Sequence, residues 1–250
     1  MSANPLSPRA AFAAQKVFLG TITPSGNTVV ERITLGILQS FPQVSMHFSR
    51  TPVFGDKDPF PTSYDFDSML AAARLLSHAN PQRILWNGSK AAGISLDLDR
   101  DLCARIQDQT GIPGTTSILA LEELLKTDGI TRYALVSPYT APYQQRIVEC
   151  LAREGYHCVA QECAGLADNL SFASIAPGSI AEMLRRAAAA KPQVILSICT
   201  NFPAAVVVAE MEAELNLPIW DTTILPVWQA LKLVGVDTSP GRAWGRLFER

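Results

Sequence analysis

The residues best suited to chemistry in this sequence are Cys199, Thr200 and Asn201, which directly follow the apolar run 194–198. Such a run is typical of a buried strand, and ligands of open α/β sheets lie just beyond the carboxyl ends of the strands. A thiol at that place can act as a nucleophile or as a proton donor, with Thr200 and Asn201 supplying hydrogen bonds. The alternative is a structural cysteine, because free cysteines are among the most buried residues.

Other polar turns follow strand-like runs in the same way. They are Pro24-Ser25-Gly26-Asn27-Thr28, Asn87-Gly88-Ser89-Lys90 and Ser137-Pro138-Tyr139-Thr140. The first of them precedes an amphipathic segment, so it fits an anion site at a helix N-terminus. It fits equally well a turn that is made by Pro, Gly and Asn for purely structural reasons.

These turns require strands and helices that alternate along the chain. Apolar patterns predict strands at residues 16–22, 44–48, 83–86, 114–117, 132–136, 157–163, 194–198 and 218–221. They predict helices at residues 29–39, 64–79, 96–110, 118–125, 141–154, 179–190, 205–215 and 222–234. The loop at 51–62 is rich in Pro and Asp and is long enough to be a lid or a specificity loop.

The two halves of the sequence correspond to each other. The segment 23–25 matches 137–139 at an offset of 114, and 82–85 matches 193–196 at an offset of 111. We therefore expect an α/β fold with two pseudo-symmetric lobes, each a parallel sheet flanked by helices, and an active site in the cleft between them. The predicted lobes comprise residues 15–117 plus 218–250 and residues 118–217.

Composition excludes several classes of protein. A net charge of −2 argues against a broad nucleic-acid surface, and no apolar run is long enough to cross a bilayer. The five cysteines show no C-x-x-C spacing, which argues against structural zinc; four of them, Cys103, Cys150, Cys158 and Cys163, are expected to fill helices or strands. Reduced thiols and an N-terminus without a secretory pattern in residues 1–14 favour a cytoplasmic location.

With these turns identified, the chain resembles the Asp/Glu racemase superfamily, and within it the branch of maleate cis-trans isomerases and arylmalonate decarboxylases. The isomerase pattern P-S-x-N-T stands here as Pro24-Ser25-Gly26-Asn27-Thr28, the S-P-Y element as Ser137-Pro138-Tyr139, and the second-lobe C-T-N as Cys199-Thr200-Asn201. The resemblance extends from Val17 to about Phe248. It implies a cofactor-independent enzyme that acts on a small carboxylate.

One departure from the family pattern matters most for the choice between its reactions. Isomerases and racemases of this group carry a first-lobe cysteine in C-T-S, and Asn87 stands at that place here. Arylmalonate decarboxylases also lack this first cysteine. With Cys199 as the only thiol, the resemblance favours decarboxylation followed by protonation of the enediolate, with a maleate-isomerase-like reaction as the alternative.

The resemblance and the chemistry together give the candidate site. Cys199, Tyr139 and Asn87 are the candidate catalytic residues, and the candidate substrate-binding residues are Pro24, Ser25, Asn27, Gly88, Ser89, Thr200 and Asn201. No metal or organic cofactor is expected. Each donor fixed around the enediolate oxygens, such as Tyr139, Ser89 or Thr200, is worth roughly 2.7–4 kcal/mol by analogy with oxyanion holes.

Further alternatives remain at this point. One is a cysteine hydrolase that uses Cys199 as nucleophile and Asn87 as oxyanion donor, and another is a carboxylate-binding protein without catalysis. Arg50 fits either a partner for a second carboxylate or a solvated charge at a strand end, and Lys90 is expected to narrow or charge the pocket. The partner is a small carboxylate, neither nucleic acid nor membrane, and a homo-oligomer stays open.

Overall fold

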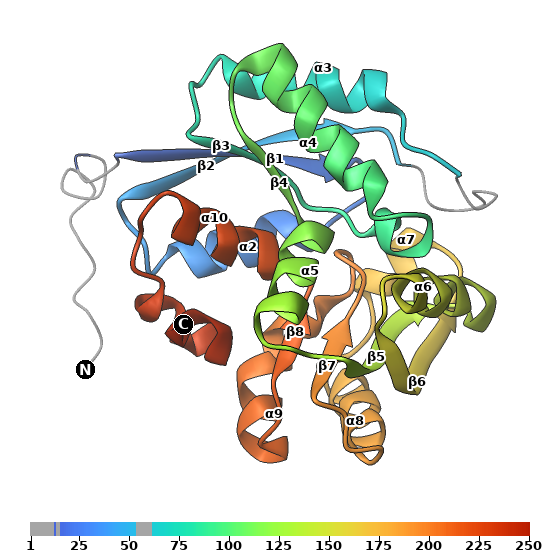
Figure 1. Ribbon diagram of the computed structural model, residues 1–250. Helices are drawn as coiled ribbons and strands as arrows, with labels where there is room; N and C mark the ends of the chain where they lie inside the picture. The colour runs from blue at the N-terminus through green and yellow to red at the C-terminus, as the bar shows by residue number, and fades with distance from the viewer. Residues whose placement is uncertain (1–12, 14–15, 54–61) are drawn as a thin grey trace.

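The computed structural model describes residues 13, 16–53 and 62–250, and it folds them into two α/β lobes (Figure 1). Most of the N-terminal segment and of the predicted lid loop, namely residues 1–12, 14–15 and 54–61, lies outside the described residues. No described helix is long and apolar enough to cross a membrane.

The first lobe contains a parallel sheet with the strand order β2-β1-β3-β4. Its strands are β1 (Val17–Pro24), β2 (Val44–Thr51), β3 (Arg83–Trp86) and β4 (Gly114–Thr116). The second lobe repeats this order as β6-β5-β7-β8, again with parallel pairing. Its strands are β5 (Arg132–Tyr139), β6 (His157–Leu166), β7 (Val194–Ser197) and β8 (Ile219–Asp221). The repeated strand order confirms the predicted pseudo-symmetric fold.

Helices cover both sheets because every connection between parallel strands has to cross over. The helices of the first lobe and its connections are α2 (Val30–Leu38), α3 (Phe66–Ser77), η1 (Lys90–Gly93), α4 (Asp97–Thr110) and α5 (Ser117–Thr127). Those that follow are α6 (Ala141–Arg153), α7 (Asn169–Ala173), α8 (Pro177–Ala188), η2 (Pro203–Val207), α9 (Val208–Leu215), α10 (Leu225–Leu233), η3 (Ser239–Trp244) and η4 (Arg246–Glu249).

The helices divide the core into two parts. Helices α3 and α4 cover one face of the first sheet and enclose a small apolar cluster with Ile22, Ile84 and Trp86. Helices α2, α5 and α10 lie on the side of that sheet that faces the second lobe (Figure 1). A larger apolar cluster continues from there through the second sheet to α6 and α8. The continuous core fixes the carboxyl ends of both sheets relative to each other.

The boundary between the lobes differs from the prediction. Residues 218–250 were expected in the first lobe, yet β8 pairs with β7 and extends the second sheet. The following helix α10 packs against β3, β4 and α5, and η3 packs against α2. Helix α5 packs against α4 and β4 as well, although the predicted boundary at residue 118 places it in the second lobe. The chain therefore returns to the first lobe after Asp221, because the backbone of β8 finds its hydrogen-bond partners in β7.

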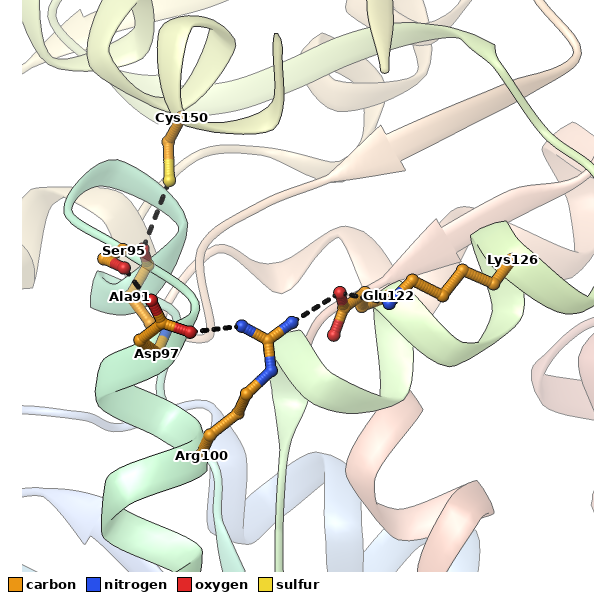
Figure 2. Close-up of polar contacts among 7 residues, drawn as sticks. All are labelled: Ala91, Ser95, Asp97, Arg100, Glu122, Lys126 and Cys150. Atoms are coloured by element: carbon orange, nitrogen blue, oxygen red, sulfur yellow. Dashed lines mark hydrogen bonds and ion pairs between the residues drawn. The ribbon is translucent and has the colours of Figure 1, made fainter. Parts of the chain in front are cut away.

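Direct contacts join the lobes near η1, as Figure 2 shows for Cys150 and Ala91. The Cys150 thiol of α6 donates to the Ala91 carbonyl oxygen at 3.8 Å, and the Arg153 guanidinium donates to the Ile94 carbonyl oxygen at 3.1 Å. Next to this joint, the Arg100 guanidinium bridges the carboxylates of Asp97 and Glu122, each at 2.6 Å. These contacts hold the loop that follows residues 87–90, the first-lobe elbow, against the second lobe.

Candidate active site

The centre of the candidate site is the thiol of Cys199, which follows β7 directly after Ile198 and is only 3% exposed. Its backbone N–H donates to Oγ1 of Thr222 at 3.1 Å. Burial raises the pKa of the thiol to about 12, and the negative charge of Asp221 acts in the same direction. The Tyr139 hydroxyl and nearby backbone N–H groups act in the opposite direction but more weakly. The thiol is therefore held protonated.

Tyr139, the last residue of β5, places its hydroxyl beside this thiol. The ring is fixed by stacking on Tyr143 of α6 at a centroid distance of 4.2 Å and by an edge contact with Phe172 of α7 at 5.3 Å. Burial raises the pKa of the Tyr139 hydroxyl well above its ordinary value, so the group stays protonated. The hydroxyl also lies 3.4 Å from Oγ of Ser89, in the first-lobe elbow.

A second pair of residues crosses between the lobes at the other predicted turn. Asn27 Nδ2 donates to Oγ1 of Thr200 at 3.2 Å, and the backbone N–H of Thr28 donates to Oδ1 of Asn201 at 2.9 Å. The Asn27 side-chain oxygen accepts the N–H groups of Val29 and Val30, both at 2.9 Å, and so caps the start of α2. This cap points the Asn27 amide N–H groups toward residues 199–201, the second-lobe elbow.

Asn87 joins the two elbows from the first lobe and is fully buried. Its Nδ2 donates to the carbonyl oxygen of Thr223 at 3.1 Å, in the turn that follows β8, while its Oδ1 has no protein partner. Gly88 comes next, and a Cβ there would lie 2.2 Å from the ring of Trp86. The tight approach of this ring restricts position 88 to glycine.

Other predicted residues have contacts directed elsewhere. Pro24 ends β1, and the Ser25 hydroxyl accepts the backbone N–H of Val53 at 3.0 Å rather than facing Cys199. Arg50 donates to the Ser25 carbonyl oxygen at 2.8 Å and pairs with Glu31 at 2.7 Å. Arg50 thus braces the first turn from outside.

Asn201 lies in the second-lobe elbow, and Lys90 lies at the end of the first-lobe elbow. Both ends of the Asn201 amide are engaged, because Oδ1 accepts from Thr28 and Nδ2 donates to the Asn169 carbonyl oxygen at 2.5 Å. The Asn201 side chain therefore fastens α7 and the first turn to the elbow. Lys90 begins η1, directly after Ser89.

Sequence reasoning missed the turn 222–224, which it assigned to a helix. Thr222 accepts the Cys199 amide, and the Thr223 hydroxyl donates to the Thr200 carbonyl oxygen at 3.4 Å. The preceding Asp221 is a fully buried acid. A signal was present, since the hydroxyl residues Thr222 and Thr223 follow a predicted strand just as Cys199-Thr200-Asn201 does.

The remaining cysteines lie away from this arrangement: Cys103 is in α4, Cys150 in α6, and Cys158 and Cys163 in β6. Within the described residues, no group of three or more His, Cys, Asp or Glu side chains could hold a metal ion. The chemistry that the site offers is therefore that of one thiol, one phenol and several amide and hydroxyl donors.

The chain has relatives among known proteins. The family model described as arylmalonate decarboxylase matches residues 66–248. The chain belongs to the arylmalonate decarboxylase family. Among curated members related to it, the maleate isomerase of Alcaligenes faecalis is 25% identical over 88% of this chain and 92% of its own length. The arylmalonate decarboxylase of Bordetella bronchiseptica is 25% identical over 59% of this chain and 62% of its own length.

Solved structures support the fold of this family member. A maleate cis-trans isomerase of Nocardia farcinica, a cysteine variant with a covalently bound succinylcysteine intermediate, superimposes with a TM-score of 0.80 at 20% identity and covers 93% of this chain and 98% of its own. A liganded arylmalonate decarboxylase variant also gives a TM-score of 0.80, at 21% identity, with 94% and 99% coverage. The family match and the two relatives show that the chain is an enzyme of the maleate isomerase/arylmalonate decarboxylase type.

Proposed function

We propose that this enzyme decarboxylates a small malonate-type dicarboxylate without a cofactor and that Cys199 protonates the resulting enediolate. The bond between the α-carbon and one carboxylate carbon breaks, CO2 leaves, and the electron pair remains as an enediolate. The S–H proton of Cys199 then moves to the α-carbon, and the thiolate recovers a proton from water. A buried thiol that is held protonated beside the Tyr139 hydroxyl supports this role more than any other observation.

The pairs that cross between the lobes supply the donors that an enediolate requires. Tyr139 and Ser89 form one pair of hydroxyls, and Asn27 with Thr200 forms the other. Donors that are fixed before the reaction stabilise the developing negative charge without reorganisation, which is usually the largest single contribution to such catalysis. We infer that these two pairs hold the carboxylate that stays, whose two oxygens become the enediolate oxygens when CO2 leaves.

The alternative is isomerisation of maleate, which is favoured by the nearly full-length match to the Alcaligenes faecalis maleate isomerase. Addition of a thiol to a double bond needs a thiolate, and the environment of Cys199 disfavours that form. The first elbow offers the amide of Asn87 rather than a second thiol. Both features support decarboxylation over isomerisation.

A substrate panel in D2O distinguishes the two reactions. Arylmalonates, alkylmalonates and maleate are incubated with the enzyme, and CO2, fumarate and α-deuteration are measured. Decarboxylation predicts CO2 release with one deuteron at the α-carbon, whereas fumarate without CO2 would overturn the proposal in favour of isomerisation. Cys199→Ser should lower the activity by orders of magnitude, while Cys163→Ser, which changes a half-buried thiol of β6, serves as the matched control.

A further inference from the structure

We propose that Asp221 is the positioning residue of Cys199: its carboxylate fixes the turn that binds the Cys199 amide, and the negative charge that it places beside the thiol opposes ionisation of the thiol. This inference rests on the proposed role of Cys199 as proton donor. It concerns a residue that the reaction itself does not use.

Asp221 is the last residue of β8 and lies beside Ser197, the last residue of β7. The carboxylate is buried and accepts the Ser197 hydroxyl at 2.8 Å. Its other oxygen accepts the backbone N–H of Thr223 at 2.9 Å and that of Ile224 at 3.4 Å. These bonds from the acid to the following residues close the turn 222–224.

The turn 222–224 binds the backbone of the second-lobe elbow before and after the thiol of Cys199. Oγ1 of Thr222 accepts the Cys199 amide at 3.1 Å and donates to the Ser197 carbonyl oxygen at 3.2 Å. The Thr223 hydroxyl reaches the backbone after Cys199, and the Thr223 carbonyl oxygen accepts Asn87 Nδ2 at 3.1 Å. One carboxylate therefore sets the position of the thiol relative to the first-lobe elbow.

The charge of Asp221 adds an electrostatic effect to this geometry. The titratable side chains that act on the thiol are Tyr139 of β5 and Asp221 of β8. Tyr143 of α6 stacks on Tyr139, and Lys90 lies at the start of η1, next to Ser89. Burial raises the pKa of Asp221 to about 6, so the carboxylate is charged over the alkaline range in which a thiol would ionise. A neighbouring negative charge disfavours the thiolate, which adds to the effect of burial.

Asp221→Asn tests the inference because an amide keeps the shape of the carboxylate. Its oxygen can accept the N–H groups of the turn and its nitrogen can donate to Ser197, while the charge is lost. The probe is the ¹³Cβ signal of Cys199 in cysteine-labelled protein, assigned with Cys199→Ser and followed from neutral pH to the alkaline limit of the folded state. We expect the titration to move to lower pH, and the alkaline limb of kcat/KM to move with it.

Two further variants separate charge from geometry. Asp99→Asn removes the other buried acid with a pKa raised to about 6, which lies behind the first elbow, and should leave the Cys199 titration in place. Thr222→Val removes the acceptor of the Cys199 amide but keeps the charge, so it should lower kcat without moving the titration.

An unchanged Cys199 titration in Asp221→Asn overturns the inference. If that variant fails to fold, the wild-type enzyme decides instead: the Cys199 signal should shift as Asp221 titrates near pH 6, and a constant signal there also overturns it. The titration requires no substrate. Full activity in Cys199→Ser would therefore refute the proposed function, whereas an inactive Cys199→Ser with an unchanged titration in Asp221→Asn would refute only the role of Asp221.

Discussion

At the carboxyl end of the first sheet Trp86 of β3 lies beside Thr116 of β4, and at the corresponding place in the second sheet Ser197 of β7 lies beside Asp221 of β8. Both lobes thus keep a buried acid near this place but in different positions. In the second lobe it is part of the strand and binds the turn next to the thiol. In the first lobe it is Asp99 of α4, which accepts the hydroxyls of Thr116 and Tyr64.

The consequence is a different role for each acid. Tyr64 accepts the indole N–H of Trp86 at 3.2 Å, so Asp99 fixes the aromatic support under the first elbow, on the face that α3 and α4 cover. Asp221 instead acts on the elbow that carries Cys199. Both lobes have the same strand order, while the candidate catalytic thiol lies in one of them.

Position 88 explains why the first elbow carries no thiol at the matching position. Counted from the ends of β3 and β7, Gly88 corresponds to Cys199 and Asn87 to Ile198, so the predicted placement of Asn87 at the position of the first thiol is corrected to Gly88. The Trp86 ring leaves no room for a Cβ at position 88. The bulky residue that Asp99 and Tyr64 hold in place therefore excludes a side chain there, and the amide of Asn87 meets the second lobe instead.

The largest effect is expected from the residue that makes the lobes unequal. Cys199→Ser replaces the proton donor with a much weaker acid and should lower kcat by about 10²–10⁴-fold, the usual contribution of a general acid. The measurement is turnover of the best substrate of the panel, with circular dichroism to verify folding. Activity within a few-fold of the wild type would mean that the asymmetry of the elbows is unrelated to catalysis.

A smaller loss is expected where the lobes share a donor pair. Tyr139→Phe keeps the ring contacts with Tyr143 and Phe172 but removes the hydroxyl, and it should lower kcat about 10²–10³-fold as the loss of one oxyanion donor does. Ser89→Ala, on the first-lobe side of the pair, should cost less because Tyr139 remains beside the thiol. Equal KM values with reduced kcat would locate the effect in the transition state; a change in KM alone would contradict it.

The sequence was sufficient to predict most of the framework. The strand 83–86 has the predicted bounds, and both lobes follow from apolar patterns and the repeated offsets. Strands β1 and β5 run further than predicted, to Pro24 and Tyr139, because their polar ends still pair with Thr51 and Leu166 of neighbouring strands. Periodicity cannot register such pairing, since it depends on a partner far away in the sequence.

The site was predictable only where short motifs carry it. Cys199, Tyr139, Ser89 and Asn27 come together as expected. The turn after β8 was assigned to a helix, since its apolar neighbours continue the helical pattern, but Asp221 captures the first backbone N–H groups and α10 starts only at Leu225. A side chain that competes with the helix for backbone donors is visible only in three dimensions.

The two buried acids should also give the protein an unusual dependence of stability on pH. Burial raises the pKa values of Asp99 and Asp221 from 3.8 to about 6, so the folded state binds these protons more tightly than the unfolded state does. Each protonated acid therefore contributes its full stabilisation below about pH 4. This contribution, about 3 kcal/mol for each acid, is lost as the pH rises through about 6. Urea unfolding across this range measures the loss.

Single variants assign the loss to the lobes. Asp99→Asn and Asp221→Asn each remove one of the two acids, and each should reduce the decline in unfolding free energy between about pH 4 and pH 6 by about half. If the unfolding free energies of both variants decline with pH as steeply as that of the wild type, burial does not raise the pKa of either carboxyl. The two acids would then not contribute to the difference between the lobes through their charge.

The smallest effect is expected at Asn27, where one side chain serves both the fold and the site. Asn27→Ala removes the oxygen that caps α2 and should cost about 1 kcal/mol of stability, together with the donor toward Thr200. Asn27→Asp keeps an oxygen at the cap, where the helix dipole favours a negative charge, but it replaces the amide donor with a group that repels a carboxylate. We therefore expect Asn27→Asp to be as stable as the wild type in thermal unfolding and to show a raised KM for the carboxylate substrate. An unchanged KM in this variant would show that Asn27 supports only the helix and does not bind the substrate.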